Sequence, residues 1–125
     1  MDVSPLNIGF FRLARDESKK STHRIQMGAV LSEKRPTSRG FNKIKTHPKF
    51  ANPALHVKIS IHAEIDCIMK SKASGDTIWV WREDLEGKPK LARPCSDCMK
   101  SLKEFGIRRI FYTIEHFPYW CEERI

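Results

Sequence analysis

The sequence predicts an α/β protein with a mixed sheet of four or five strands and an antiparallel hairpin near its N-terminus. The first observation behind this prediction is the order of the hydrophobic patterns, which indicates a helix, a hairpin and then alternating helices and strands. The second is that two polar motifs, His62-Ala63-Glu64 and Pro94-Cys95-Ser96-Asp97-Cys98, each stand at the beginning of a predicted helix. The length of 125 residues suits one domain, residues 1–125, with its own core.

The N-terminal part is predicted to form a helix followed by the hairpin. The helix covers Pro5–Ser18, with Ser4 as its N-cap. Its apolar residues fall on one face: Leu6, Phe10, Leu13 and Ala14. Ile25–Ser32 and Ser38–Asn42 are the two antiparallel strands. Gly28, in the first of them, indicates that another part of the backbone approaches closely there.

The segment between the hairpin and the second helix is the longest predicted loop. Lys43–Ile59 leads directly to His62, and long loops in small domains are usually functional. The second helix covers Ile61–Ser71, with Ser60 as its N-cap. Four apolar residues of this helix are expected to face the core: Ile61, Ile65, Ile68 and Met69. Thr77–Arg82 then has the apolar composition of a buried strand.

The C-terminal part is predicted to contain a polar insertion, a third helix and a strand. We expect the insertion, Glu83–Arg93, to project as a small hairpin. The helix covers Cys95–Phe105 with Gly106 as its C-cap, and the strand covers Ile107–Ile114. Too few residues follow for a crossover helix and another parallel strand. A fifth strand after Pro118 is therefore expected to be a short antiparallel edge strand.

The two helical crossovers predict parallel neighbouring strands with right-handed connections. The second and third helices then begin beyond the carboxyl ends of strands, where open α/β sheets place their sites. The two polar motifs are therefore expected to share one cleft. Trp79 and Trp81 alternate on one strand and are expected in the core, whereas Tyr119 and Trp120 are expected to cover the sheet edge or a partner subunit.

The two polar motifs together contain the donor set of a catalytic zinc site. Cys95 and Cys98 lie three residues apart, behind Pro94 at the first helical position, so both thiols share one face of the first turn. A helix N-terminus lowers the pKa of such thiols. With His62 as third ligand, the fourth position of a Zn²⁺ ion is left to water. Glu64 is placed to take a proton from that water and deliver it to a substrate nitrogen.

Each motif alone also fits simpler explanations. A single C-x-x-C pair can be a redox dithiol or half of a structural zinc site. The joint pattern is what favours a catalytic zinc. Cys67 lies among apolar residues of the second helix and is predicted to pack in the core.

The net positive charge lies entirely in the first half of the chain. Residues 1–60 contain 12 Lys and Arg against 4 Asp and Glu, whereas residues 61–125 contain 11 of each. This distribution suits a phosphate-bearing partner, either a nucleotide or a single strand of nucleic acid, and equally a solvated surface. No signal peptide and no membrane-spanning apolar run is recognisable, so the sequence predicts a cytoplasmic protein.

The two motifs, with Gly28-Ala29-Val30-Leu31 and Gly40-Phe41-Asn42, make residues 4–114 similar to the cytidine deaminase-like superfamily. The deoxycytidylate and tRNA-adenosine deaminase branches are the most similar. The resemblance implies a three-layer α/β/α cytidine deaminase-like fold. The insertion Glu83–Arg93 departs from the family pattern, in which the strand is followed quickly by the Pro-Cys motif.

The resemblance also implies roles for individual residues. It implies that His62, Cys95 and Cys98 bind zinc and that Glu64 transfers protons. It further implies that Asn42 hydrogen-bonds the substrate base or sugar and that the backbone N–H of Ala63 faces a base oxygen. A homo-oligomer is compatible with this family.

Three functions are open on the sequence. The favoured one is zinc-dependent hydrolytic deamination of cytosine to uracil in a nucleotide or nucleoside, with release of ammonia. The second is deamination of cytidine or adenosine in single-stranded DNA or RNA. The basic first half would support it, as would stacking of bases on the aromatic residues Phe41, Phe50, Trp79 and Trp81, although the two tryptophans are expected in the core. The third is a non-enzymatic, zinc-stabilised nucleic-acid-binding module, which would have no need of Glu64.

Overall fold

A five-stranded mixed sheet forms the centre of the computed structural model, which describes residues 5–46 and 58–125. Its strands are β1 (Met27–Ser32), β2 (Pro36–Phe41), β5 (Thr77–Arg82), β6 (Arg109–Thr113) and β7 (Trp120–Arg124). Their order is β2-β1-β5-β6-β7, with β5 and β6 parallel and the other neighbours antiparallel. The predicted mixed sheet and N-terminal hairpin are confirmed, and β7 is the expected antiparallel edge strand.

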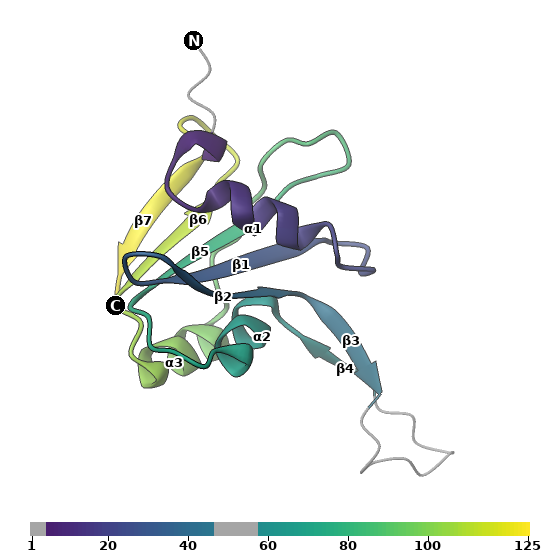
Figure 1. Cartoon of the computed structure of the whole chain (residues 1–125). Coiled ribbons are helices and arrows are strands. Elements are labelled where there is room, and N and C mark those ends of the chain that lie inside the picture. Colours follow the sequence, from purple (N-terminus) through teal and green to yellow (C-terminus); the bar gives the residue numbers. More distant parts are fainter. Residues whose placement is uncertain (1–4, 47–57) are drawn as a thin grey trace.

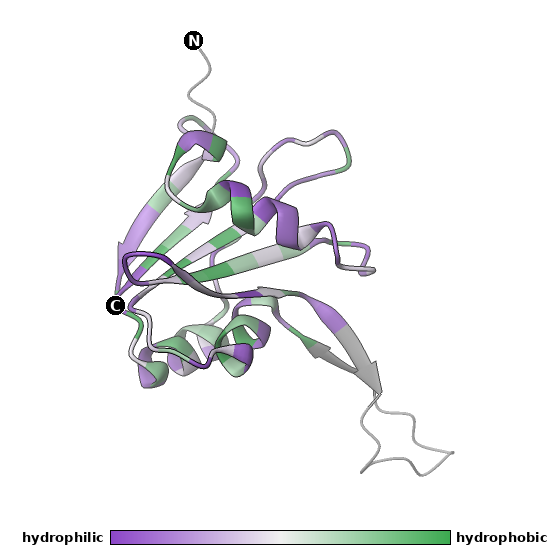
Figure 2. Cartoon of the chain, in the orientation of Figure 1, coloured by the Kyte–Doolittle hydropathy of each residue, from purple (hydrophilic) through white to green (hydrophobic). Residues whose placement is uncertain are grey.

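Helices cover both faces of the sheet. Helix α1 (Phe11–Ser18) lies on one face, and α2 (Ala63–Lys70) and α3 (Ser96–Phe105) lie on the other (Figure 1). The predicted three-layer α/β/α arrangement is therefore confirmed. The hydrophobic residues of the central strands lie between these layers (Figure 2). Among the described residues, no helix has the length and apolar character needed to cross a bilayer.

The two halves of the core differ in composition. The side facing α1 is aromatic: Trp79 stacks on Phe111 with ring centroids 3.9 Å apart, and Phe11 meets Trp79 edge-on at 5.3 Å. The expected burial of Trp79 and Trp81 is confirmed, since they are 8% and 2% exposed. The other side is aliphatic and contains Leu31, Ile78, Val80, Leu102 and Ile110.

One of the two predicted crossovers differs from the expectation. The connection through α3 does join the parallel neighbours β5 and β6. The connection through α2 instead leads from the hairpin to β5, which pairs antiparallel with β1. Because β1 lies between β2 and β5, these two strands run in the same direction without being neighbours.

The predicted first helix is divided into two. A 3-10 turn, η1 (Pro5–Asn7), precedes α1, and Gly9 between them has a left-handed backbone with φ of 47°. A Cβ atom at Gly9 would overlap the indole ring of Trp79, so the break lets the chain pass close to the core. The predicted N-cap, Ser4, lies outside the described residues.

The predicted core face of the second helix is only partly correct, because Ile68 packs against the core but Met69 does not. Met69 is 70% exposed, whereas Ala63, Glu64 and Cys67 are buried. The helix also begins later than predicted, with His62 and not Ser60 as its N-cap. A Cβ atom at Gly40 of β2 would overlap the backbone nitrogen of Cys67, so the helix lies directly on β2 and only small residues fit between them. The predicted burial of Cys67 is confirmed.

The segment Lys43–Ile59, predicted as a loop, contains a second sheet. Strands β3 (Lys43–Thr46) and β4 (Lys58–Ile61) pair antiparallel, and residues 47–57 lie outside the described part of the chain. Phe50 is among the latter. The insertion Glu83–Arg93 does project as a small hairpin, with an isolated bridge between Glu83 and Pro89 (Figure 1).

Candidate active site

The N-termini of α2 and α3 converge on one point of the structure. His62 is the N-cap of α2 and Cys95 the N-cap of α3, and both have extended backbones. The first backbone hydrogen bonds of the helices run from Asp66 N to His62 O and from Met99 N to Cys95 O. Cys98 follows in the first turn of α3, on the side of Cys95. Pro94 therefore precedes the N-cap and does not occupy the first helical position that was predicted for it.

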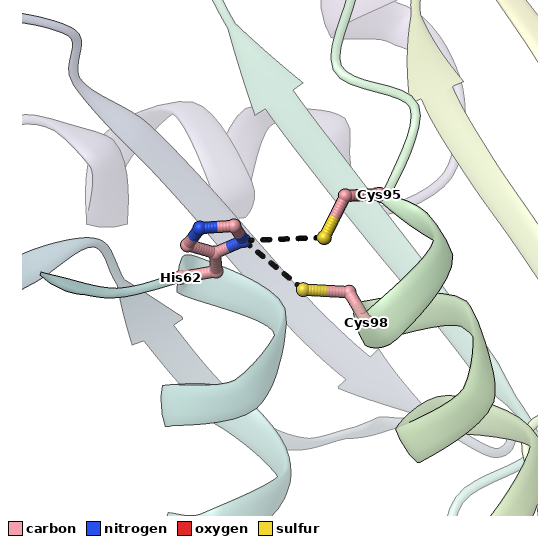
Figure 3. Close-up of side chains that lie close together, drawn as sticks. All are labelled: His62, Cys95 and Cys98. Atoms are coloured by element: carbon pink, nitrogen blue, oxygen red, sulfur yellow. Dashed lines mark hydrogen bonds between the residues drawn. The ribbon is translucent and has the colours of Figure 1, made fainter.

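The three predicted ligands lie together as expected (Figure 3). Nδ1 of His62 is 3.0 Å from Sγ of Cys98 and 3.7 Å from Sγ of Cys95, and the three ligand atoms lie within 4.8 Å of one another. Tetrahedral zinc with Zn–N of ~2.1 Å and Zn–S of ~2.3 Å requires ligand separations of roughly 3.6 Å. The donor chemistry fits Zn²⁺ with a fourth position free. The distance from His62 to Cys95 matches the required separation, whereas the distance from His62 to Cys98 is shorter than it.

The pKa of the Cys98 thiol differs from the sequence-based expectation. Burial raises the pKa of Cys98, and the carboxyl group of Glu64 raises it further. The helix N-terminus alone therefore does not supply a thiolate at this position. A bound cation would do so, because thiolate is the form that ligates zinc.

Glu64 lies in the first turn of α2 with only 1% of its surface exposed. Burial raises the pKa of its carboxyl group, while its own backbone N–H and His62 partly oppose this effect. Within the described part of the chain, its Oε1 atom has no hydrogen-bond partner. An unpartnered buried carboxylate oxygen is costly, and it marks a position from which a ligand can be contacted.

A pocket of about 240 Å³ opens in front of these groups. Its walls bring Glu64, His62 and Cys95 together with residues from β1, β5 and several loops: His23, Ile25, Met27, Asn42, Arg82, Leu91 and Arg93. Arg82 was not predicted as a pocket residue, although its place at the carboxyl end of β5 was a usable signal. No sequence signal identified His23, Ile25 or Arg93, which reach the pocket from loops.

Asn42 lies at the edge of this pocket but also has a structural role. Its Oδ1 accepts the backbone N–H of Met27 at 2.8 Å, and its Nδ2 donates to the carbonyl of Ile25. These bonds fix the segment that leads into β1. The second hydrogen of Nδ2 and the second lone pair of Oδ1 remain available for a ligand. The two bonds to the backbone fix the directions in which they point.

The segment leading into Cys95 is fixed by the end of β6. Thr113 is fully buried, and its hydroxyl group lies 2.6 Å from the carbonyl oxygen of Lys90, to which it donates. Its carbonyl accepts the N–H of Ala92 at 3.0 Å, and Arg82 donates to the carbonyl of Leu91 at 3.2 Å. The last residues of the insertion thus fix the path of the chain into Cys95.

The comparisons with known proteins agree with this geometry. A family model described as the cytidine and deoxycytidylate deaminase zinc-binding region matches residues 7–114. Among solved structures, the dCMP deaminase of the cyanophage S-TIM5, in its apo form, has a similar fold. The TM-score is 0.60 at 21% identity, over 86% of this chain and 82% of that one. A search of curated proteins found no match.

Proposed function

The chain belongs to the cytidine and deoxycytidylate deaminase zinc-binding family, and on this premise we propose that it converts cytosine to uracil in a nucleotide or nucleoside. The residues proposed as metal ligands are His62, Cys95 and Cys98, and Glu64 is the proposed catalytic residue. The products would be the uracil-bearing compound and ammonia, formed with consumption of one water.

The observation that supports this proposal most directly is the position of Glu64. Its carboxyl group is buried beside the three ligands, and Oε1 lacks a partner among the described residues. A structural zinc site has no use for such a group, because burying an unpartnered carboxyl destabilises the fold. This argues against a zinc-stabilised binding module without enzymatic activity.

Zinc, when bound, would lower the pKa of a water molecule so that hydroxide is available near neutral pH. Glu64 would accept the proton of this water while the oxygen attacks the ring carbon that bears the amine. The same carboxyl group would pass this proton to the adjacent ring nitrogen. It would then take the proton of the newly added hydroxyl group and deliver it to the amine, which leaves as ammonia while the carbonyl forms. The burial that raises the pKa of Glu64 helps the carboxyl group to hold a proton between these steps.

Two further groups are proposed to orient the base. The first-turn N–H of Ala63 has no intrahelical acceptor, as at every helix N-terminus, and would donate to the base oxygen. The remaining Nδ2 hydrogen of Asn42 would reach the base or the sugar. Both groups are held rigidly, Ala63 by complete burial and Asn42 by its two bonds to the backbone.

The experiment is to incubate zinc-loaded protein with dCMP, CMP, deoxycytidine and cytidine and to measure ammonia and the uracil product. The corresponding adenine compounds test whether the protein requires cytosine as the base. Ammonia from at least one cytosine compound, and none from protein in which Glu64 is replaced by Gln, is the expected result. Release of ammonia from adenine compounds alone would overturn the assignment to cytosine.

A further inference from the structure

A second cavity, of about 820 Å³, adjoins the catalytic pocket of about 240 Å³. We call it the outer groove. One wall is formed by the end of α1 and by residues 23–26, and the other by residues 82–87 and Lys90 of the projecting hairpin. The two cavities meet at His23, Ile25 and Arg82, which line both. A base in the catalytic pocket would therefore have the outer groove directly beside it.

The acidic residues of the outer groove are mostly engaged within the protein. Glu83 is buried and binds both Arg15 at 3.1 Å and Lys19 at 2.8 Å. Asp84 accepts two backbone N–H groups of its own hairpin, from Glu86 and Lys88, each at 2.9 Å. Glu86 pairs with Lys88 at the hairpin tip. Glu115 is the one remaining acid.

Two arginines of the outer groove lack such partners. Arg24 is exposed and forms no ion pair within the described part of the chain. Arg82 donates one hydrogen bond to the carbonyl of Leu91, and no carboxylate among the described residues pairs with it. Among the lining residues that the structure describes, the unpaired cations Arg24 and Arg82 therefore outnumber the one unpaired acid, Glu115. Guanidinium groups suit phosphate because they can donate two parallel hydrogen bonds to it.

The boundary between the cavities has the features of a phosphate contact. Arg82 lies at this boundary. The Nδ1 atom of His23 accepts a hydrogen bond from the backbone N–H of Ile25 at 3.1 Å. A neutral ring so bonded has its proton on Nε2, where it can be donated to a ligand. Ile25, 40% exposed, provides apolar surface at the same place, and the fully exposed Leu85 lies further along the groove.

We propose that the outer groove holds the nucleotide next to the target cytosine, so that a single-stranded oligonucleotide is a better substrate than the mononucleotide. This inference rests on the proposed function and extends its substrate. The linking phosphate lies at Arg82 and His23, and the neighbouring nucleotide lies between Arg24 and the projecting hairpin. A mononucleotide fills the smaller cavity and leaves the larger one to solvent.

The first test measures binding and does not depend on turnover. Zinc-loaded Glu64→Gln protein is titrated with a fluorescent strand that contains one cytosine, either among thymidines in DNA or among uridines in RNA. The mononucleotides dCMP and CMP are then added as competitors. We expect the better strand to bind at least about tenfold more tightly than either mononucleotide, the equivalent of about 1.4 kcal/mol. Equal affinity for strand and mononucleotide would overturn the proposal, whatever the result of the deaminase assay.

The second test uses matched variants at opposite ends of the sheet. Arg24→Ala should weaken strand binding about tenfold and reduce its salt dependence, with a smaller effect on mononucleotides. Arg35→Ala removes the same charge in the turn between β1 and β2, far from the outer groove, and should change neither. Equal effects of the two substitutions would show that the cations act only through net charge and would refute the site.

The third test measures turnover with the wild-type enzyme. The ratio of kcat/KM for the strand to kcat/KM for dCMP should exceed ten and should fall in Arg24→Ala. A protein that binds the strand through Arg24 but deaminates nothing would refute the proposed function and leave the groove assignment supported. A protein that deaminates dCMP and the strand equally well would refute the groove assignment alone.

Discussion

Glu123 of β7 binds the guanidinium group of Arg93 through two hydrogen bonds, of 2.9 Å from Nε and 3.0 Å from Nη2. The hydroxyl group of Tyr112 donates a third hydrogen bond to the same carboxylate at 3.1 Å. Arg93 lies two residues before Cys95 and lines the catalytic pocket. The last strand of the sheet therefore helps to position one wall of the site without contributing a ligand.

Replacing Glu123 by Gln should loosen that wall. The hydrogen bonds from Arg93 are the main reason that the pKa of Glu123 lies below its usual range. A carboxyl group with a lowered pKa stabilises the fold above its unfolded pKa, and this contribution is lost as pH falls through the folded value. The melting temperature of Glu123→Gln should therefore be lower than that of the wild type at neutral pH, and the difference should disappear in acid. KM should rise about fivefold, as expected for about 1 kcal/mol of lost binding.

The neighbouring residue provides the control. Glu122, also on β7, pairs with Arg109 of β6, and neither residue lines the catalytic pocket. Glu122→Gln should leave KM unchanged. A rise in KM of similar size in both variants would mean that β7 acts through general stability and not through Arg93.

Gly40→Ala should disturb the site through the backbone of α2. A Cβ atom there would lie 2.6 Å from the carbonyl oxygen of Ala63 and would overlap the backbone nitrogen of Cys67. Helix α2 would have to move away from β2, at a cost of about 1–3 kcal/mol in the free energy of unfolding. Because His62 caps this helix, zinc affinity should fall as well. Urea denaturation and competition with a zinc-binding dye measure the two effects.

The substitution Gly106→Ala separates the effect on the free energy of unfolding from the effect on zinc affinity. Gly106 ends α3 with φ of 109°, and no atom lies within 4 Å of a Cβ placed there. The substitution should cost about 1 kcal/mol through backbone strain while zinc affinity stays the same. If Gly106→Ala lowered zinc affinity as much as Gly40→Ala, the contact between β2 and α2 would not be what positions His62.

The cluster of His62, Cys95 and Cys98 could be predicted because it depends on local signals. Cys95 and Cys98 share one helical turn, and His62 and Glu64 stand at the start of another helix. Each pair is fixed by sequence spacing alone. The pairs come together because α2 and α3 pack beside each other on one face of the five-stranded sheet, although α2 follows β4 of the separate two-stranded sheet.

The features that the sequence analysis missed depend on contacts between distant segments. Hydrophobicity favours Met69 over Ala63 as a core residue, but the close approach of α2 to Gly40 leaves space only for small side chains. Gly9 interrupts a helical pattern because Trp79, far along the chain, occupies the space beside it. The pocket walls at His23 and Arg93 are likewise set by loops whose paths no local pattern describes.

Removal of either cysteine ligand should release the metal. Cys95→Ala or Cys98→Ala leaves two ligands, which hold zinc poorly. Metal analysis should then find little zinc, and the melting temperature should fall towards that of chelator-treated wild type, since α2 and α3 converge on the ion. Cys121→Ala, at a half-buried cysteine of β7, should retain one zinc per chain. Full zinc content in Cys95→Ala would indicate a different set of ligands.

Replacing Glu64 by Gln should abolish activity while preserving the metal and the fold. Gln keeps the shape of the side chain, and its neutral amide suits a position where burial already disfavours the charged carboxylate. It cannot accept a proton from water or return it to the base, so kcat should fall by a factor of about 10²–10⁴ or more. Zinc content and melting temperature, measured on the same preparation, establish that only proton transfer has been lost. Turnover near the wild-type rate in a zinc-loaded Glu64→Gln protein would mean that another group moves the proton, and the unpartnered oxygen of Glu64 would then need a different explanation.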